Sequence, residues 1–177
     1  MRDWERILYG LHPHLLAWIW AGLLLLQLAL AFFVFTNPRI PGLTILGWVI
    51  WAVGTVFALV PIVTLRTQGG VPKGKSYMAT SVLVDRGIYA IVRHPQGATA
   101  GILLNLALPL IGQHWLVALL SGVGIILIYV DALKTDQACI EKFGEAYLHY
   151  MERVPRANPI VGILRLLRRR ASASHAP

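Results

Sequence analysis

Two long runs without a single charged residue, residues 15–35 and 43–65, restrict the fold more than any other feature of the chain. They hold 21 and 23 residues, and about 20 apolar residues suffice for a helix to cross the hydrocarbon core of a bilayer. The chain is 56% hydrophobic and only 14% charged, as membrane proteins are. The first run is longer than the apolar core of a signal peptide, and no small-residue cleavage site follows it, so we expect a retained transmembrane helix.

Two further apolar runs, residues 95–112 and 115–130, are separated by a very short turn. The sequence therefore predicts an all-α protein, an integral membrane helical bundle with about four transmembrane helices. We expect a single membrane domain: residues 1–66 with two N-terminal spans, residues 67–160 with two more, and residues 161–177 as a basic tail.

Lysine and arginine residues gather at one end of this predicted bundle. Of the 16, all except Arg39 lie in the N-terminal segment, in the loop at residues 66–93, or after residue 131. Because cytoplasmic loops carry an excess of basic residues, we expect a multi-pass protein with both termini in the cytoplasm. The basic residues at the end of the chain are then expected to bind anionic membrane lipids. We expect no nucleic-acid partner.

A C-terminal amphipathic helix on the cytoplasmic side is predicted over residues 133–150. The residues of its less polar face are spaced by three or four positions. They are Asp136, Ile140, Phe143, Tyr147 and Tyr150. The residues of the opposite face are Glu141, Lys142, Glu145 and His149.

The densest group of chemically able side chains occupies residues 87–96, between the two apolar halves. Pro95 suits the first turn of a helix, so Arg93 and His94 stand at the start of the third predicted span. The backbone N–H groups of residues 96–98 then lack helical partners, and together with the helix dipole they favour an anion. In an alternative interpretation, Arg93 extends to lipid phosphates and His94 only caps the helix.

Other kinds of site are not predicted. The single cysteine, Cys139, excludes an internal disulfide and a site built from several cysteines. The six histidines have no spacing to cysteine or acidic residues that is typical of zinc, so we expect no metal. Glycine loops that cradle phosphates and motifs of serine nucleophiles are also absent from the sequence.

Several short segments occur together in an order that resembles a known family. They are Gly87-Ile88-Tyr89, Arg93-His94-Pro95, an apolar hairpin, Lys142-Phe143-Gly144-Glu145-Ala146-Tyr147-Leu148-His149-Tyr150, and Arg153-Val154-Pro155-Arg156. This arrangement is similar to that of the isoprenylcysteine carboxyl methyltransferase and phospholipid methyltransferase superfamily. The similarity covers roughly residues 80–160.

The resemblance implies a membrane methyltransferase that binds S-adenosylmethionine at the cytoplasmic face. It implies that the cofactor pocket is lined by Leu83, Val84, Tyr89, His94, Pro95, Gln96 and Gly97, and closed by Asp136 from the other side. Arg93 and His94 are the candidate catalytic residues, and Arg93 or the helix terminus suits the cofactor carboxylate. Catalysis would rest mainly on in-line positioning, with the acceptor held about 3 Å from the methyl group.

The chain departs from the family pattern at three places. Gly97 stands where the family has tyrosine, and Thr135 and Asp136 stand where it has two glutamates. Residues 130–131 stand where the prenylcysteine enzymes have an arginine, for which Lys134 is a substitute. Two hypotheses therefore remain. The protein methylates a lipid or another amphipathic small-molecule acceptor, or it is a catalytically degenerate relative that serves a membrane protein partner as a subunit or assembly factor.

Overall fold

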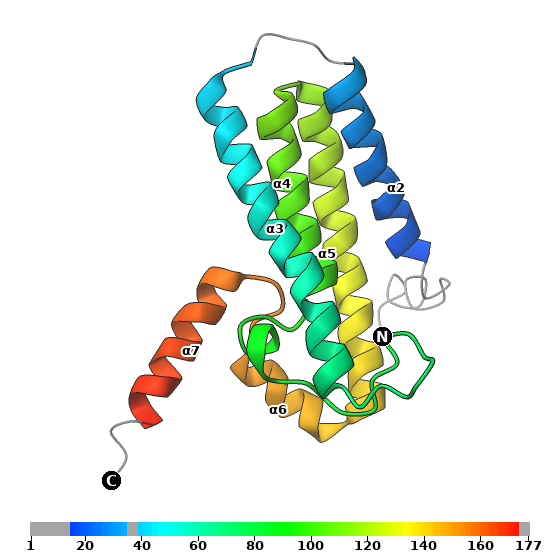
Figure 1. Cartoon of the computed structure of the whole chain (residues 1–177), viewed down its shortest axis with the longest axis vertical. Coiled ribbons are helices and arrows are strands. Elements are labelled where there is room, and N and C mark those ends of the chain that lie inside the picture. Colours follow the sequence, from blue (N-terminus) through cyan, green and yellow to red (C-terminus); the bar gives the residue numbers. More distant parts are fainter. Residues whose placement is uncertain (1–14, 35–38, 174–177) are drawn as a thin grey trace, which may run out of the picture.

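The computed structural model describes residues 15–34 and 39–173, and all regular secondary structure in this part of the chain is helical (Figure 1). The main helices are α2 (Leu15–Ala29), α3 (Pro41–Gln68), α4 (Gly101–Gly112), α5 (Trp115–Phe143), α6 (Glu145–Arg153) and α7 (Pro159–Ala173). Three short helical segments complete them: the π-helices η1 (Leu30–Val34) and η3 (Pro95–Ala100), and the 3₁₀ turn η2 (Gly87–Ala90). The expected N-terminal segment 1–14 and the last four residues of the expected tail lie outside the described residues.

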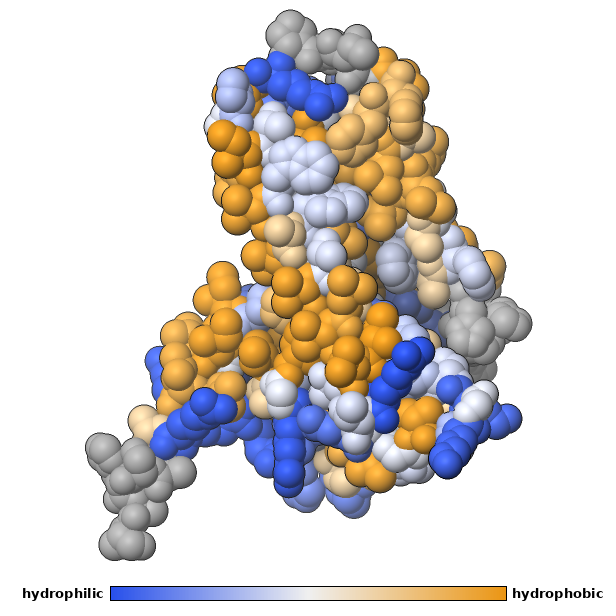
Figure 2. All heavy atoms as spheres, in the orientation of Figure 1, coloured by the Kyte–Doolittle hydropathy of each residue, from blue (hydrophilic) through white to orange (hydrophobic). Residues whose placement is uncertain are grey.

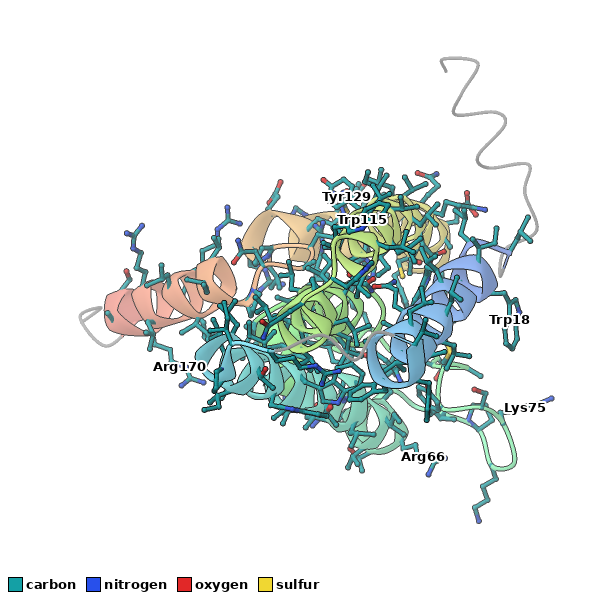
Figure 3. The ribbon with its side chains drawn as sticks, turned by 90° about the horizontal axis from the view of Figure 1, so that it is seen from above. Trp18, Arg66, Lys75, Trp115, Tyr129 and Arg170 are labelled. Atoms are coloured by element: carbon teal, nitrogen blue, oxygen red, sulfur yellow. The ribbon has the colours of Figure 1, made fainter. Side chains whose placement is uncertain are left out.

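Three helical segments are long and apolar enough to cross a membrane: Leu15–Val34, Pro41–Gln68 and Trp115–Phe143. Large apolar side chains along them are exposed on the outside of the bundle, and Figure 2 shows this as a tall apolar surface above a basic lower rim. Seen from above, Trp18 points away from the bundle (Figure 3). The prediction of a membrane protein built from helices is confirmed at this level. The expected third span, residues 95–112, is helical through η3 and α4 but shorter than these three segments.

Small residues let the long helices approach one another. A side-chain carbon added at Gly47 of α3 would meet the side chain of Ile111 in α4 at 2.7 Å, and one added at Gly124 of α5 would meet the Asn105 amide at 2.5 Å. Close backbone packing of this kind is what holds helices together where lipid removes the hydrophobic drive. The sequence places these glycines on the contact faces of α3 and α5.

A buried polar cluster ties three helices together inside the bundle. Gln27 of α2 donates to Asn105 of α4 at 3.1 Å and accepts from Ser121 of α5 at 2.6 Å. Asn105 also donates to the carbonyl of Gly101 at 2.9 Å. All three side chains are buried, so each needs such partners.

The predicted helix over residues 133–150 is two helices in the structure. Helix α5 continues to Phe143, and Gly144 then adopts φ +56° and ψ −136°, which ends α5 and starts α6. A positive φ suits glycine and ends a regular helix. Burial agrees with the predicted faces: Asp136, Tyr147 and Tyr150 are buried, Ile140 and Phe143 are half-buried, and the four residues of the opposite face are exposed.

Within the basic tail expected at residues 161–177, the structure shows a helix: α7 has 15 residues and runs from Pro159 to Ala173. Asn158 caps it through a hydrogen bond from the Val161 N–H to its side-chain oxygen at 3.1 Å. Pro159 then occupies the first helical position, where a missing N–H costs nothing. The arginines of the tail are therefore displayed on a defined surface.

Candidate functional site

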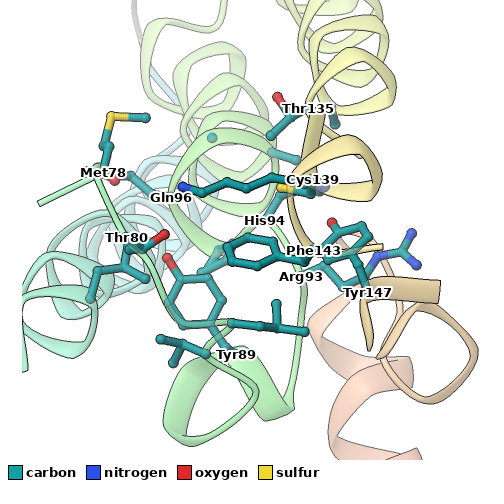
Figure 4. Close-up of a pocket in the computed structure, with 18 of the residues that line it drawn as sticks. Met78, Thr80, Tyr89, Arg93, His94, Gln96, Thr135, Cys139, Phe143 and Tyr147 are labelled. Carbon is teal, nitrogen blue, oxygen red and sulfur yellow. The ribbon is translucent and has the colours of Figure 1, made fainter. Parts of the chain in front are cut away.

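One cavity of about 500 Å³ lies at the basic end of the bundle. Its walls come from α2, from the loop between α3 and η2, from the segment around η3, and from α5 and α6. A cavity of this volume falls within the roughly 300–1,000 Å³ of small-molecule sites. Figure 4 shows the side chains around it, with Phe143 between Tyr89 and Tyr147 in this view.

The segment at residues 87–96 is held in place by the chain that follows α6. The N–H groups of Arg93 and His94 donate to the carbonyls of Pro155 and Arg156, both at 3.0 Å. The Tyr150 hydroxyl donates to the carbonyl of Tyr89 at 2.7 Å. Burial raises the pKa of the Tyr150 hydroxyl, which keeps it a donor. Two of the segments that carry the family resemblance therefore lie side by side, although about 60 residues separate them in the sequence.

Asp136 is the centre of a buried polar cluster beside the cavity. Its carboxylate accepts from His94 Nε2 at 2.7 Å, the Tyr147 hydroxyl at 2.7 Å, Arg93 Nη2 at 3.1 Å and Arg156 Nε at 2.7 Å. Only 3% of Asp136 is exposed. Two guanidinium groups on one carboxylate compensate the cost of burying the charge, and charge-assisted hydrogen bonds of this kind are the stronger ones.

The other members of this Asp136 cluster are equally constrained. Arg93 also donates through Nη1 to the carbonyl of Met151 at 3.2 Å, which leaves both of its terminal nitrogens engaged. Burial and the bond to Asp136 raise the pKa of Tyr147, so its hydroxyl stays protonated as a donor. Arg156 donates in addition to the Tyr129 hydroxyl at 2.8 Å. The cluster thus joins α5, α6, the 87–96 segment and residues 154–158, which connect α6 to α7.

Eight of the residues predicted from the sequence line the cavity. They are Leu83, Val84, Tyr89, Arg93, His94, Pro95, Gln96 and Gly97. Gly97 faces open space, because a side-chain carbon added there would meet nothing within 4 Å. Burial raises the pKa of the Tyr89 hydroxyl in the wall. These eight positions therefore lie around one cavity.

Asp136 is placed differently from the expectation that it touches a cofactor. It is not among the residues that line the cavity, and its oxygens already serve four donors. Thr135 lines the cavity instead, and its hydroxyl donates to the carbonyl of Asp131. Lys134, the expected substitute for the family arginine, is not a lining residue either.

The expected row of free N–H groups at residues 96–98 is shorter in the structure. The Ala98 N–H donates to the carbonyl of His94 at 3.2 Å, and the Thr99 N–H shares this acceptor at 2.9 Å. The N–H groups of Gln96 and Gly97 donate to no described residue. The local cause is the π-helical winding of Pro95–Ala100, a geometry found often at functional sites.

Sequence reasoning missed several lining residues. Aromatic rings from four segments contribute: Trp20, Tyr77, Phe143, Tyr147 and Tyr150. Lys142 supplies a cation, and its ammonium lies 5.1 Å from the centroid of the Phe143 ring. The Tyr77 hydroxyl donates to Gln96 at 3.0 Å and so attaches the loop after α3 to the 87–96 segment. The family-like segment at residues 142–150 contained four of these residues, but only the fold shows which of its faces meets the cavity.

Comparisons of the chain with known protein families, with characterised proteins and with solved structures find no match. Within residues 15–34 and 39–173, no group of three or more histidine, cysteine and acidic residues could hold a metal ion. The cavity and its side chains are therefore the observations on which a function has to be argued.

Proposed function

We propose that the protein is an integral membrane methyltransferase that uses S-adenosylmethionine and acts on a lipid or another amphipathic acceptor at the cytoplasmic face. The observation that carries this proposal is that two segments far apart in the sequence line one cavity of about 500 Å³: eight residues within positions 83–97, and Lys142, Phe143, Tyr147 and Tyr150. The order of the motifs resembles the isoprenylcysteine carboxyl methyltransferase and phospholipid methyltransferase superfamily, and this resemblance supports the proposal.

The chemistry of the lining fits the cofactor. Tyr89, Phe143 and Tyr147 offer aromatic faces, which attract both a sulfonium cation and a flat nucleobase. The Lys142 ammonium and the free N–H groups of Gln96 and Gly97 suit a carboxylate. S-adenosylmethionine supplies, when bound, an electrophilic methyl group that needs only a correctly placed acceptor.

The cavity also extends toward the apolar part of the bundle. Ala17 and Trp20 of α2 and Ile128 and Ala132 of α5 line this side of it. All four belong to helices long and apolar enough to cross a membrane. An acceptor with an acyl or prenyl chain would find an apolar wall there and a polar wall at the other end, which favours an amphipathic molecule over a soluble one.

The Asp136 cluster gives Arg93 and His94 a positioning role in this proposal. Asp136 holds the His94 ring through Nε2 and so fixes the orientation of a ring that lines the cavity. Arg93, with both terminal nitrogens engaged, fixes the backbone of the motif through α5 and α6. A reaction that depends mainly on the position of the methyl group and its acceptor requires a rigid cavity wall, and these contacts make the wall rigid.

The finer topology belongs to the same proposal. Residues 95–112 cross the membrane as a fourth span, and both termini are cytoplasmic. This is supported by Gln113, which follows α4 and exchanges two hydrogen bonds with the backbone of Ile40, before α3, at 2.8 and 3.0 Å. The start of α3 and the end of α4 therefore lie at one end of the bundle, and the loop after α3 lies at the other (Figure 1). The residues that line the cavity include several from this loop.

A second function is favoured by one specific observation. Arg93, His94 and Asp136 are engaged with one another and with Tyr147 and Arg156, so the polar groups of the motif form a closed structural cluster. A relative that has lost catalysis and serves as a subunit or assembly factor would keep such a cluster for stability alone. In that case the cavity would bind no cofactor.

Calorimetric titration of the purified protein in detergent with S-adenosylmethionine separates the two functions. We expect saturable binding that is weakened in Tyr89→Ala and retained in Lys73→Ala, a control in the exposed part of the loop after α3. Absence of heat at millimolar cofactor, with the protein still folded, would exclude the methyltransferase and leave the subunit role.

A further inference from the structure

Helix α7 carries an apolar stripe that no described part of the protein covers. Ile160, Ile163, Leu164 and Leu167 are spaced by three or four residues, so they share one face of the helix. Their exposed fractions are 70%, 44%, 51% and 56%. Four exposed aliphatic side chains on one face of a 15-residue helix require a partner or an apolar solvent.

The opposite face of α7 is the one that contacts the protein. Gly162 packs so closely on the carbonyl of Ile91 that a side-chain carbon at this position would collide with it. Arg169, on the same face, donates through Nη2 to the carbonyl of Ala90 at 3.4 Å. Rotation of the helix to bury the apolar stripe would break both contacts. The stripe is therefore held outward by the fold.

Basic residues border the stripe. Arg165, Arg168 and Arg170 are exposed, and at 100° per residue Arg168 and Arg170 fall on its two edges. No acidic residue occurs between residues 159 and 173. Figure 2 shows apolar spheres over α7 at the height of the apolar lower part of the bundle, with basic side chains below them. In the view from above, α7 leaves the bundle at one side, with Arg170 at its edge (Figure 3).

From this arrangement we infer that α7 is an interfacial helix that docks on the anionic lipid surface of the membrane the spans cross. The apolar stripe enters the boundary between headgroups and acyl chains to a depth of about 5–10 Å, while the arginines bind lipid phosphates. Anionic lipid is the partner favoured by the charge, because each basic residue near such a surface contributes about 1 kcal/mol. The docking does not depend on the methyltransferase proposal, since it uses residues outside the cavity.

Because α7 contacts Ala90 and Ile91, its docking on the membrane also affects the position of the cavity. These two residues follow Tyr89 and precede Arg93, so a docked α7 lies directly behind the turn that shapes one wall of the cavity. Lipid binding by α7 therefore also fixes the height of the cavity relative to the bilayer.

The test uses the full-length protein in nanodiscs, with Cys139→Ser as background and one new cysteine that carries an environment-sensitive fluorophore. Ile163→Cys places the probe on the stripe, and Ser172→Cys places it on the polar side of the same helix as a matched control. The nanodiscs contain phosphatidylcholine alone or a mixture with phosphatidylglycerol, and part of the lipid carries a nitroxide quencher near the headgroup.

We expect a blue-shifted emission and strong nitroxide quenching at position 163 in the anionic nanodiscs, and neither at position 172. Replacement of Arg165, Arg168 and Arg170 by glutamine should lower the docking equilibrium about fivefold per arginine. High salt should act in the same direction, because the Debye length falls from about 10 Å at 0.1 M to about 3 Å at 1 M.

Three results would overturn the inference. Equal quenching of position 163 in neutral and anionic nanodiscs would remove the role of anionic lipid. A blue shift without lipid quenching, together with cross-linking between two copies at position 163, would identify a second copy as the partner. An unshifted, unquenched probe in both lipid mixtures would show that the stripe stays in water.

Discussion

Asp136 shows how much the role of a single residue depends on its neighbours. From the sequence, a carboxylate on the face of a helix near the membrane surface is a natural ligand for the amino or hydroxyl groups of a cofactor. In the structure, four donors from three different parts of the chain reach it. The spacing that placed Asp136 on the same face as Tyr147 was visible in the sequence, whereas the approach of Arg156 depends on the turn after α6.

Replacement of Asp136 by alanine is therefore expected to destabilise the protein strongly. It would leave the guanidinium of Arg93, which is 8% exposed, and that of Arg156 without a counter-charge. Removal of one partner of a buried ion pair costs about 3–5 kcal/mol. Thermal unfolding in detergent should reveal this loss. Glu141→Ala, on the exposed face of the same helix, is the control and should change stability by about 0.5 kcal/mol or less.

Substitution of Gly97 tests the proposal that the cavity binds S-adenosylmethionine. A side chain at this position meets open space, so Gly97→Tyr should fold like the native protein. If the cavity binds S-adenosylmethionine, the added ring restores an aromatic wall and should tighten binding by about 0.5–1.5 kcal/mol, roughly two- to tenfold. Calorimetry on Gly97→Tyr, with Gly97→Ala as the control, measures this. Loss of folding in the tyrosine variant alone would mean that the space is needed by something other than a small cofactor.

At the scale of helices, the sequence predicted which side of a helix is buried better than it predicted where a helix begins and ends. The period of apolar residues identified the buried side of residues 133–150, because burial follows the helical repeat wherever the helix continues. The break at Gly144 was invisible to that period, since Phe143 and Tyr147 keep their spacing across it. Helix α7 was not predicted, because the run of arginines was interpreted as a basic tail that binds anionic lipid. Its signals were Asn158 and Pro159 at the start and the apolar spacing that follows.

The break at Gly144 leads to a prediction at this scale. Its φ of +56° combined with ψ of −136° belongs to a region essentially confined to glycine. Gly144→Ala should therefore destabilise the packing of α6 against α5 by about 1–3 kcal/mol. Gly122→Ala is the matched control, because Gly122 lies inside α5, where an added side-chain carbon meets nothing. Alanine there should be neutral or stabilising by up to about 1 kcal/mol. Equal effects of both variants on the unfolding midpoint would contradict the argument.

At the scale of the whole molecule, two groups of polar side chains hold the helices together by hydrogen bonds, one at each end of an apolar bundle. At one end, Gln113 bonds to the backbone of Ile40 and to the Thr44 hydroxyl. At the other end, the Asp136 cluster joins α5 and α6 to the motif segment. The apolar runs made the bundle predictable, because a membrane helix needs only length and composition. The cavity between the loop after α3, the 87–96 segment and α5 was not predictable in detail. Its shape depends on contacts between distant residues, such as the hydrogen bond from Tyr77 to Gln96.

The last prediction concerns the proposed four-span topology, which can be tested with single cysteines in a Cys139→Ser background. Lys75→Cys in the loop after α3 and Ser172→Cys in α7 should react with an impermeant thiol reagent only from the cytoplasmic side. Gly42→Cys at the start of α3 and Trp115→Cys at the start of α5 should react only from the opposite side. Trp115 is the decisive position: reaction from the same side as Lys75 would mean that residues 95–112 do not cross the membrane. The hydrogen bonds between Gln113 and Ile40 would then have to break in the bilayer, because they require Trp115 and Gly42 to share one end of the bundle.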